Sequence, residues 1–318
     1  MRYTDLTGQT DCSIAQALGV VGDAWTLLLV RDVAGGVHQF DALQERLGIS
    51  RKVLTVRLQA LVEDGVLAKH LYHQRPPRYE YRLTEAGRGL LPVLAALQDW
   101  GSRYVLGDGS LSATSEADSA ETRRVHGLVG SRVPEALLPA ATAAGPAGAL
   151  DPVAEGHRWT ALYCYPGAFL PTAQAYPPGW GEIPGARGCT LESCTYRDRL
   201  AEFAARGVAV RGVSTGRPDQ LAEFAAHEGI QFPLLSDAEL QLAVGLRLPT
   251  FRAAGVDRLK RLTLVVDGER VVRGVLYPLP DPAGSVEDVL ALIDSLAGAS
   301  EAGQAAEPGS AAGPGSAG

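Results

Sequence analysis

Sulfur-containing residues are scarce in this chain of 318 residues, which has four cysteines and one methionine. The cysteines form one close pair, Cys189 and Cys194, and two singletons, a spacing that argues against a zinc site, so we expect no metal or cofactor. The chain also has no uninterrupted run of eighteen apolar residues, and its N-terminal residues do not lead into a signal-type apolar run. We therefore expect a cytoplasmic protein with no membrane partner, in which a close cysteine pair is more typical of redox chemistry than of a structural disulfide.

Positive charge is in the minority overall but is concentrated in one region. The formal net charge is −7, yet the range 46–88 has nine Lys and Arg against four Asp and Glu. An acidic chain with one locally basic module is not expected to coat nucleic acid along its length. The basic module itself is typical of a DNA reader.

Changes in composition divide the chain into two domains. Residues 1–106 show helical periodicity followed by a hairpin, which predicts an α+β winged helix-turn-helix domain. A linker rich in Gly, Ser and Ala is expected over 107–124, and a disordered tail over 298–318. Between them, 125–297 alternates apolar strands (160–165, 208–214, 262–266) with helices (217–228, 286–296), which predicts an α/β domain.

A reading helix is expected after Ser50. This residue is an N-cap for a helix that ends near Gly65, and a short helix and turn precede it. At about 100° per residue, four polar side chains gather on the face opposite the apolar stripe, where a major groove would be contacted. They are Arg51, Lys52, Thr55 and Gln59.

The hairpin that follows predicts a wing. Strands are expected over 66–73 and 79–83, with Arg75 and Arg78 projecting from a proline-restricted tip toward a minor groove or phosphates. Arg57 lies toward the apolar side of the reading helix, so a structural ion pair is favoured over a DNA contact.

The N-terminal region resembles the HxlR family of winged-helix regulators over about residues 10–105. The resemblance is carried by the segments 12–15 (CSIA), 22–32 (GDAWTLLLVRD) and 76–84 (PPRYEYRLT). It implies a homodimer that reads a palindromic double-stranded operator. Cys12 matches a cysteine that is a redox sensor in some family members, while a packing role at a helix start is the alternative.

Cys189 begins a run with helical spacing, and Cys194 lies five residues later in it. A thiol at a helix N-terminus faces free N–H groups and the positive end of the dipole, which favours the reactive thiolate. Residues five apart in a helix have Cα atoms roughly 8–9 Å apart, whereas a disulfide needs less than about 7 Å. Forming a bond between these cysteines would therefore require the helix to unwind.

The C-terminal region resembles the peroxiredoxins of the thioredoxin-like superfamily, in particular the bacterioferritin-comigratory type. The motifs that carry the resemblance are 165–167 (YPG), 188–198 (GCTLESCTYRD), 232–237 (FPLLSD), 248–251 (LPTF) and 260–263 (KRLT). It implies that the Cys189 thiolate attacks a peroxide, that Cys194 resolves the product, and that Arg261 stabilises the thiolate. A thioredoxin-like donor would then reduce the disulfide.

The nucleophile loop departs from the family pattern. Ala186 stands where the family has a threonine, Glu182 replaces a proline, and about ten extra residues lie around 173–183. Thr190 and Thr172 are the candidates for the missing hydroxyl. These departures weaken the case for fast peroxide turnover and leave slower sensing chemistry as an alternative.

The two resemblances together predict a redox-responsive transcriptional regulator. The alternative is a thioredoxin-dependent peroxidase whose winged helix only dimerises or localises it. A third reading places the sensor at Cys12 and makes the second domain a degenerate ligand module with a non-catalytic cysteine pair.

Overall fold

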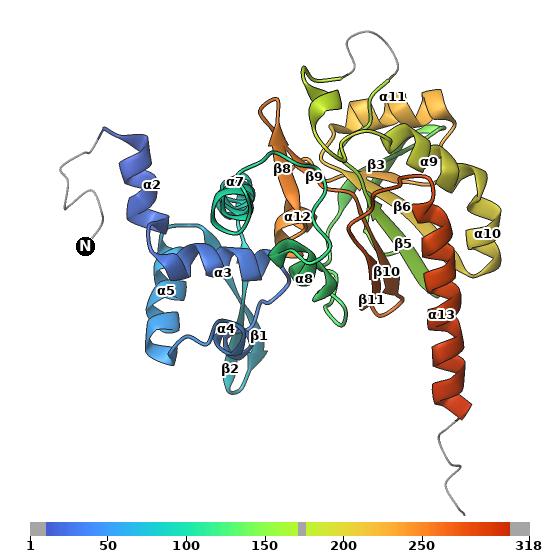
Figure 1. Ribbon diagram of the computed structural model, residues 1–318. Coiled ribbons are helices and arrows are strands. Elements are labelled where there is room, and N and C mark those ends of the chain that lie inside the picture. Colours follow the sequence, from blue (N-terminus) through green and yellow to red (C-terminus); the bar gives the residue numbers. More distant parts are fainter. Residues whose placement is uncertain (1–10, 171–175, 306–318) are drawn as a thin grey trace, which may run out of the picture.

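The computed structural model describes residues 11–170 and 176–305, with side chains up to Gly298. Its N-terminal part is a compact set of helices with one hairpin (Figure 1). The elements are α2 (Ser13–Val21), α3 (Ala24–Ala34), α4 (Phe40–Leu47), α5 (Arg51–Glu63), β1 (Leu67–Gln74), β2 (Pro77–Leu83), α6 (Glu85–Arg88), α7 (Leu91–Trp100) and a π-helical turn η1 (Gly101–Val105).

Local capping explains why the helices of this part begin and end where they do. The Ser50 hydroxyl accepts a hydrogen bond from the Val53 N–H (3.3 Å), which confirms the predicted N-cap of α5. Gly48 ends α4 in the left-handed conformation (φ 62°), which costs a glycine little. The helices α3, α4 and α5 then bury Leu29, Leu43 and Leu54 in one core, so the helix-turn-helix and its wing form as predicted.

The C-terminal part contains a seven-stranded sheet, a hairpin and several helices. The elements are α8 (Ala120–His126), β3 (Leu138–Thr142), β4 (Gly145–Leu150), β5 (Trp159–Cys164), η2 (Trp180–Glu182), α9 (Cys189–Asp198), α10 (Leu200–Ala205), β6 (Val208–Ser214), α11 (Pro218–Glu228), β7 (Leu234–Ser236), α12 (Gln241–Gly245), β8 (Thr250–Ala253), β9 (Val256–Leu259), β10 (Leu262–Asp267), β11 (Val272–Leu276) and α13 (Ser285–Ala305).

The sheet has the order β11-β10-β5-β6-β7-β3-β4. Strands β5, β6 and β7 are parallel, and β10 pairs with β5 in the antiparallel sense. The unit β11-β10-β5-β6 with crossing helices is the thioredoxin-like core, which confirms the predicted fold. Ala161 and Tyr163 of β5 pack with α9, α10, α11 and α13 on one face of the sheet, while Leu162 and Cys164 face α8 and α12 on the other.

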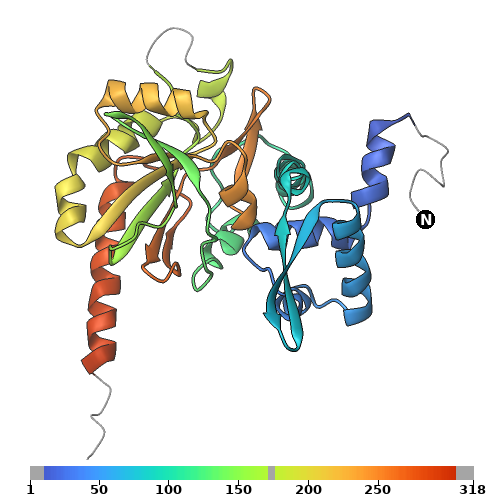
Figure 2. The ribbon, with the colours of Figure 1, turned by 180° about the vertical axis from the view of Figure 1, so that it is seen from behind.

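The two domains dock directly on each other (Figure 2). Leu91 and Ala95 of α7 belong to the same buried cluster as the second face of the sheet. A Cβ added to Gly245 of α12 would lie 2.8 Å from the carbonyl oxygen of Ala34 in α3, so this junction admits only glycine without a shift. The Gln98 side chain of α7 donates a hydrogen bond to the Leu248 carbonyl (2.6 Å).

Two expectations differ from the structure. The segment expected as a linker packs against the second domain, because Ala113 is fully buried and its N–H donates to the Pro184 carbonyl (2.8 Å), and 120–126 form α8. The tail expected to be disordered from residue 298 is helical to Ala305, since α13 continues through it, and 306–318 lie outside the described residues.

No single helix among the described residues is long and apolar enough to cross a membrane, although the pair Ser13–Val21 and Ala24–Ala34, bent by 75°, reaches that length and composition together.

Candidate functional site

Cys189 is the first residue of α9 and lies beneath the loop that follows β5. Gly188 precedes it in a left-handed conformation (φ 100°), where a Cβ would lie 2.5 Å from the ring of Pro282. The Cys189 side chain is 6% exposed. Its Sγ lies 3.5 Å from Nη2 of Arg261 and 3.7 Å from the Ala186 carbonyl oxygen. The structure thus brings together Cys189 and Arg261, which are 72 residues apart in sequence.

A buried carboxylate completes this cluster and was missed by the sequence analysis. Glu192 is fully buried and forms an ion pair with Arg261, which also donates to the Arg187 carbonyl (3.0 Å). Three residues separate Cys189 from Glu192, a spacing that places both on one side of a helix. That spacing is the signal that could have identified Glu192 from sequence.

The electrostatics oppose the simple expectation of a helix-terminal thiolate. Burial raises the pKa of Cys189 above its ordinary value, because desolvation disfavours the charged form. The adjacent Arg261 guanidinium lowers the same pKa, and the Glu192 carboxylate raises it. Burial also raises the pKa of Glu192 to about 7, against the influence of Arg261. The charge on Glu192 therefore influences how much thiolate Cys189 forms.

Cys194 lies within the same helix but faces a different neighbour. Its Sγ donates to Oε2 of Glu228 at the end of α11 (3.3 Å), and burial together with that bond raises the pKa of Cys194 to about 11. Five residues at about 100° each place the two cysteines roughly 140° apart around the helix. The structure therefore places both cysteines in α9 without bringing their side chains together.

No hydroxyl among the described residues forms a hydrogen bond with the Cys189 thiol, whose partners are the Ala186 carbonyl and Arg261. Ala186 is fully buried at the position three residues before Cys189. Thr190 is half-buried, and its hydroxyl makes no hydrogen bond to any residue that the structure describes. Thr172 lies outside the described residues.

A second arginine stands near the thiol and was also missed by the sequence analysis. Arg258 of β9 is 8% exposed and lies between the rings of Phe169 and Trp180, with its Cζ 5.2 and 5.1 Å from the two ring centroids. Its Nη1 donates to the Pro166 carbonyl (3.3 Å), and burial lowers its pKa while its interaction with Cys189 raises it. A second cation, packed against two aromatic rings, thus lies near Cys189.

The side chains predicted for the reading helix lie on the exposed face of α5, and several have local partners. Arg51 forms an ion pair with Asp41 (2.8 Å) and stacks on Phe40 at 4.8 Å. Thr55 and Gln59 make hydrogen bonds within α5, and Lys52 is exposed. Separately, the Arg57–Asp23 distance of 3.3 Å agrees with a structural ion pair.

The remaining predicted positions lie away from the thiol site. Arg75 is exposed in the turn between β1 and β2, and Arg78 is exposed as the second residue of β2. Cys12 is the half-buried N-cap residue of α2. Neither location brings these residues into contact with Cys189.

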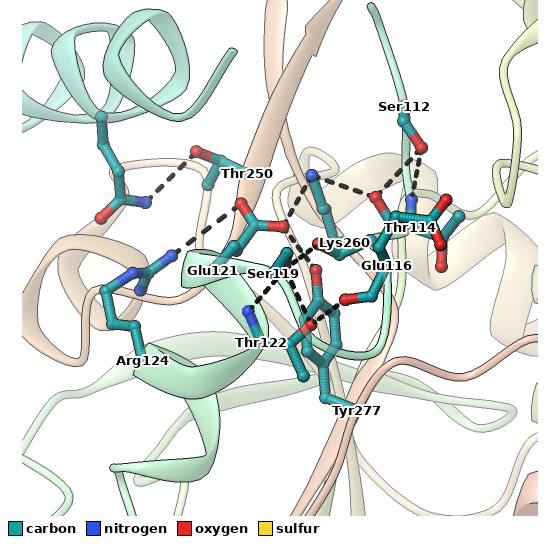
Figure 3. A network of polar contacts seen from close by, with 12 residues as sticks. Ser112, Thr114, Glu116, Ser119, Glu121, Thr122, Arg124, Thr250, Lys260 and Tyr277 are labelled. Carbon is teal, nitrogen blue, oxygen red and sulfur yellow. Dashed lines mark hydrogen bonds and ion pairs between the residues drawn. The ribbon is translucent and has the colours of Figure 1, made fainter. Parts of the chain in front are cut away.

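A polar network joins the segment after η1 to Lys260 in the connection between β9 and β10 (Figure 3). Lys260 donates to Glu121 of α8 (2.8 Å) and to the Thr114 carbonyl (3.2 Å). The Tyr277 hydroxyl donates to the same Glu121 oxygen (2.6 Å). Because Lys260 precedes Arg261 directly, the thiol cluster and this network share one stretch of backbone.

Comparisons with known proteins agree with two domains from different families. The model for HxlR-like helix-turn-helix proteins matches residues 20–108, and the model for the AhpC/TSA family matches residues 183–275. The uncharacterized HTH-type transcriptional regulator Rv3095 of Mycobacterium tuberculosis is 45% identical over 93 residues, which are 29% of this chain and 59% of that protein. The uncharacterized regulator YdeP of Bacillus subtilis is 33% identical over 108 residues, which are 34% of this chain and 84% of that protein.

Among solved structures, the peroxidoxin BcpB from Mycobacterium tuberculosis is 26% identical with a TM-score of 0.43, covering 53% of this chain and 97% of its own. The bacterioferritin comigratory protein of Xanthomonas campestris is 24% identical with a TM-score of 0.40, covering 50% and 92%. The sheet order and the family models carry the assignment. The chain belongs to the HxlR-like helix-turn-helix family through its N-terminal domain and carries an AhpC/TSA peroxiredoxin domain behind it.

Proposed function

We propose that the protein is a redox-responsive DNA-binding regulator. Residues 1–106 would bind double-stranded operator DNA as a homodimer, and 125–297 would react with peroxide, with 107–124 connecting them. The observation that carries the proposal is the adjacency of Lys260 and Arg261. The Lys260 side chain binds Glu121 and the Thr114 carbonyl in the segment that connects the domains, and Arg261 contacts the Cys189 thiol.

The chemistry begins at the Cys189 thiolate. Its sulfur attacks the terminal oxygen of a hydroperoxide, the O–O bond breaks, and the products are a sulfenic acid and an alcohol or water. Arg261 stabilises the thiolate and the developing negative charge on the leaving oxygen. The Cys194 thiol then displaces water from the sulfenic acid to form a disulfide, and a thioredoxin-like dithiol reduces that disulfide.

The regulatory step follows from the helix geometry. The disulfide requires α9 to open, which pulls Glu192 away from Arg261 and leaves a buried cation without its partner. A shift of Arg261 moves the backbone that also positions Lys260, Glu121 and Thr114. The packing between α7 and the peroxiredoxin domain would change, and with it the spacing of the reading helices in a dimer.

DNA binding with and without peroxide tests this proposal. We expect peroxide to change the operator affinity of the wild type and to leave Cys189→Ser unchanged. Cys12→Ser is the matched control, because it removes a half-buried thiol outside the cluster. If Cys189→Ser responds like the wild type, or Cys12→Ser loses the response, the proposed sensor is wrong.

The second candidate function is a thioredoxin-dependent peroxidase, which the contact between Arg261 and Cys189 also supports. The buried thiol and the alanine at position 186 favour slow turnover instead. Rapid peroxide consumption with a thioredoxin system, together with equal affinity for operator and random DNA, would favour the enzyme.

A further inference from the structure

A cleft unrelated to the thiol cluster lies between the two domains. Its volume is about 740 Å³, within the range of small-molecule sites. The winged-helix domain contributes the turn after α3 and part of β2, and the peroxiredoxin domain contributes residues 130–135 and the end of α12. Val33, Leu91 and Leu128 add apolar surface.

The residues that line this cleft carry mostly positive charge. One carboxylate, Glu135, lies among the lining residues, and each domain contributes guanidinium groups. We call the site the arginine cleft after Arg46, Arg82, Arg88, Arg132, Arg247 and Arg270.

Three of these arginines already have carboxylate partners. Arg46 lies 3.6 Å from Asp32, Arg82 lies 2.8 Å from Glu80, and Arg270 lies 2.9 Å from Asp151. The cleft nevertheless keeps an excess of positive charge, because the other three form no ion pair with any residue that the structure describes.

Two of those three arginines donate hydrogen bonds to backbone carbonyls, and the third does not. Arg88 donates to the Leu83 carbonyl (3.3 Å), and Arg132 donates to the Glu269 carbonyl (2.9 Å). Arg247 is half-buried, and its guanidinium makes no hydrogen bond within the described part of the chain.

The backbone of Arg247 has a conformation that is unfavourable for residues other than glycine. Its φ is +52°, a conformation that non-glycine residues rarely adopt. Burial lowers its pKa, and the neighbouring cations Arg31, Arg46 and Arg124 lower it further, against the opposing influence of Asp32. Strain and like-charge crowding at one residue are typical of a binding position rather than of a structural one.

We propose that the arginine cleft binds a phosphorylated small molecule of nucleotide size, such as a nucleoside diphosphate. Guanidinium groups match phosphate oxygens in bidentate pairs, and two phosphates neutralise the unpaired charge of Arg88, Arg132 and Arg247. The ligand contacts both domains, so it stabilises their docked arrangement. The site adds a metabolite input that does not depend on the peroxide chemistry proposed above.

Calorimetry with the full-length protein and ADP or pyrophosphate tests the site. We expect one binding site, with Kd raised roughly tenfold to a hundredfold in Arg247→Asn and in Arg132→Gln, as expected for the loss of one charge-assisted contact. Asparagine tolerates the left-handed backbone of position 247, and circular dichroism checks that both variants fold. Arg158→Gln removes an exposed arginine outside the cleft and should bind as the wild type does.

Four results would overturn the proposal, and the first three concern binding of ADP or pyrophosphate. They are an absence of binding heat at millimolar ADP and pyrophosphate, equal loss of binding in Arg158→Gln, and unchanged binding in both cleft variants. A fourth is displacement of ADP by duplex DNA with equal loss of DNA affinity in Arg247→Asn, which would assign the cleft to the DNA interface. Cys189→Ser should bind ADP normally, so failure of the redox proposal is separable from failure here.

Discussion

Oxidation of Cys189 and Cys194 to a disulfide should open the start of α9 and lower the stability of the protein. In a helix their Cα atoms are about 8–9 Å apart, whereas a disulfide spans about 4.4–6.8 Å. The cysteines must therefore approach by at least about 1 Å and also rotate toward each other. Cys194 must leave Glu228, and Cys189 must leave Arg261.

The size of the effect follows from what the opening breaks. Separating the buried Arg261–Glu192 pair costs about 3–5 kcal/mol, and losing the buried Tyr163–Ser193 hydrogen bond costs about 1–3 kcal/mol. A disulfide that closes a short loop returns about 2 kcal/mol. The net loss is about 2–6 kcal/mol, and at about 2–4 °C for each kcal/mol the melting temperature should fall by about 4–24 °C.

Hydrogen exchange with mass spectrometry checks where the opening occurs. After stoichiometric peroxide, amide protection should fall in residues 189–198 of the wild type, and the melting temperature should fall with it. Cys194→Ser reaches the sulfenic acid without the disulfide, so its α9 should stay protected. A mapped Cys189–Cys194 disulfide with unchanged protection in α9, or with a higher melting temperature, would refute this reasoning.

Three further perturbations test separate parts of the molecule. Glu192→Gln should lower the pKa of Cys189, because the negative charge of Glu192 raises that pKa. The pH dependence of iodoacetamide alkylation measures the pKa of Cys189, and an unchanged or higher pKa in the variant would contradict this prediction. The pKa of Glu192 in the folded protein is raised to about 7, so its contribution to stability is present at low pH and is lost as the pH rises from about 4.5 through 7. Over this pH range the free energy of unfolding should therefore fall less steeply in Glu192→Gln than in the wild type. Gly245→Val should cost about 1–3 kcal/mol and loosen the domain junction, seen as a larger radius of gyration in X-ray scattering, whereas Gly101→Ala, which meets nothing within 4 Å, should not. Arg75→Gln should weaken binding to all duplexes alike and reduce the salt slope by about one, and a loss confined to one sequence would exclude a phosphate contact.

The sequence predicts well where a local rule decides the structure. Ser50 caps α5 because a hydroxyl at that position satisfies a free N–H, and the apolar period of the helix places Leu54 in the core. The strands β5, β6 and β10 are long apolar runs and were expected within one or two residues of their observed bounds. Strands β3 and β4 consist mostly of Gly, Ala and Pro, and have no periodic signal of this kind.

The site itself was predicted only in part, because its properties arise from packing. Arg261 was predicted from the motif around it. Arg258 was not predicted, because its position depends on aromatic rings that only the fold brings next to it. The composition of 107–124 indicates a flexible linker, yet Ala113 fills a space that exists only once Trp180 and Phe251 are in place. The pKa of Cys189 likewise depends on burial that helix position alone does not reveal.

The connection between β9 and β10, which carries Arg261, is the route by which we propose that a redox change reaches the DNA-binding domain. Lys260 and Arg261 are consecutive residues in the connection between β9 and β10, and their side chains contact different clusters. Arg261 is 2% exposed, and without Glu192 it would be an uncompensated cation in a nonpolar site, which costs more than a modest displacement. Any displacement that rehydrates Arg261 also moves Lys260 against Glu121, whose carboxylate holds α8 and Tyr277 together. We therefore expect the junction to respond to the charge pairing of Arg261 and not to the cysteine oxidation state directly.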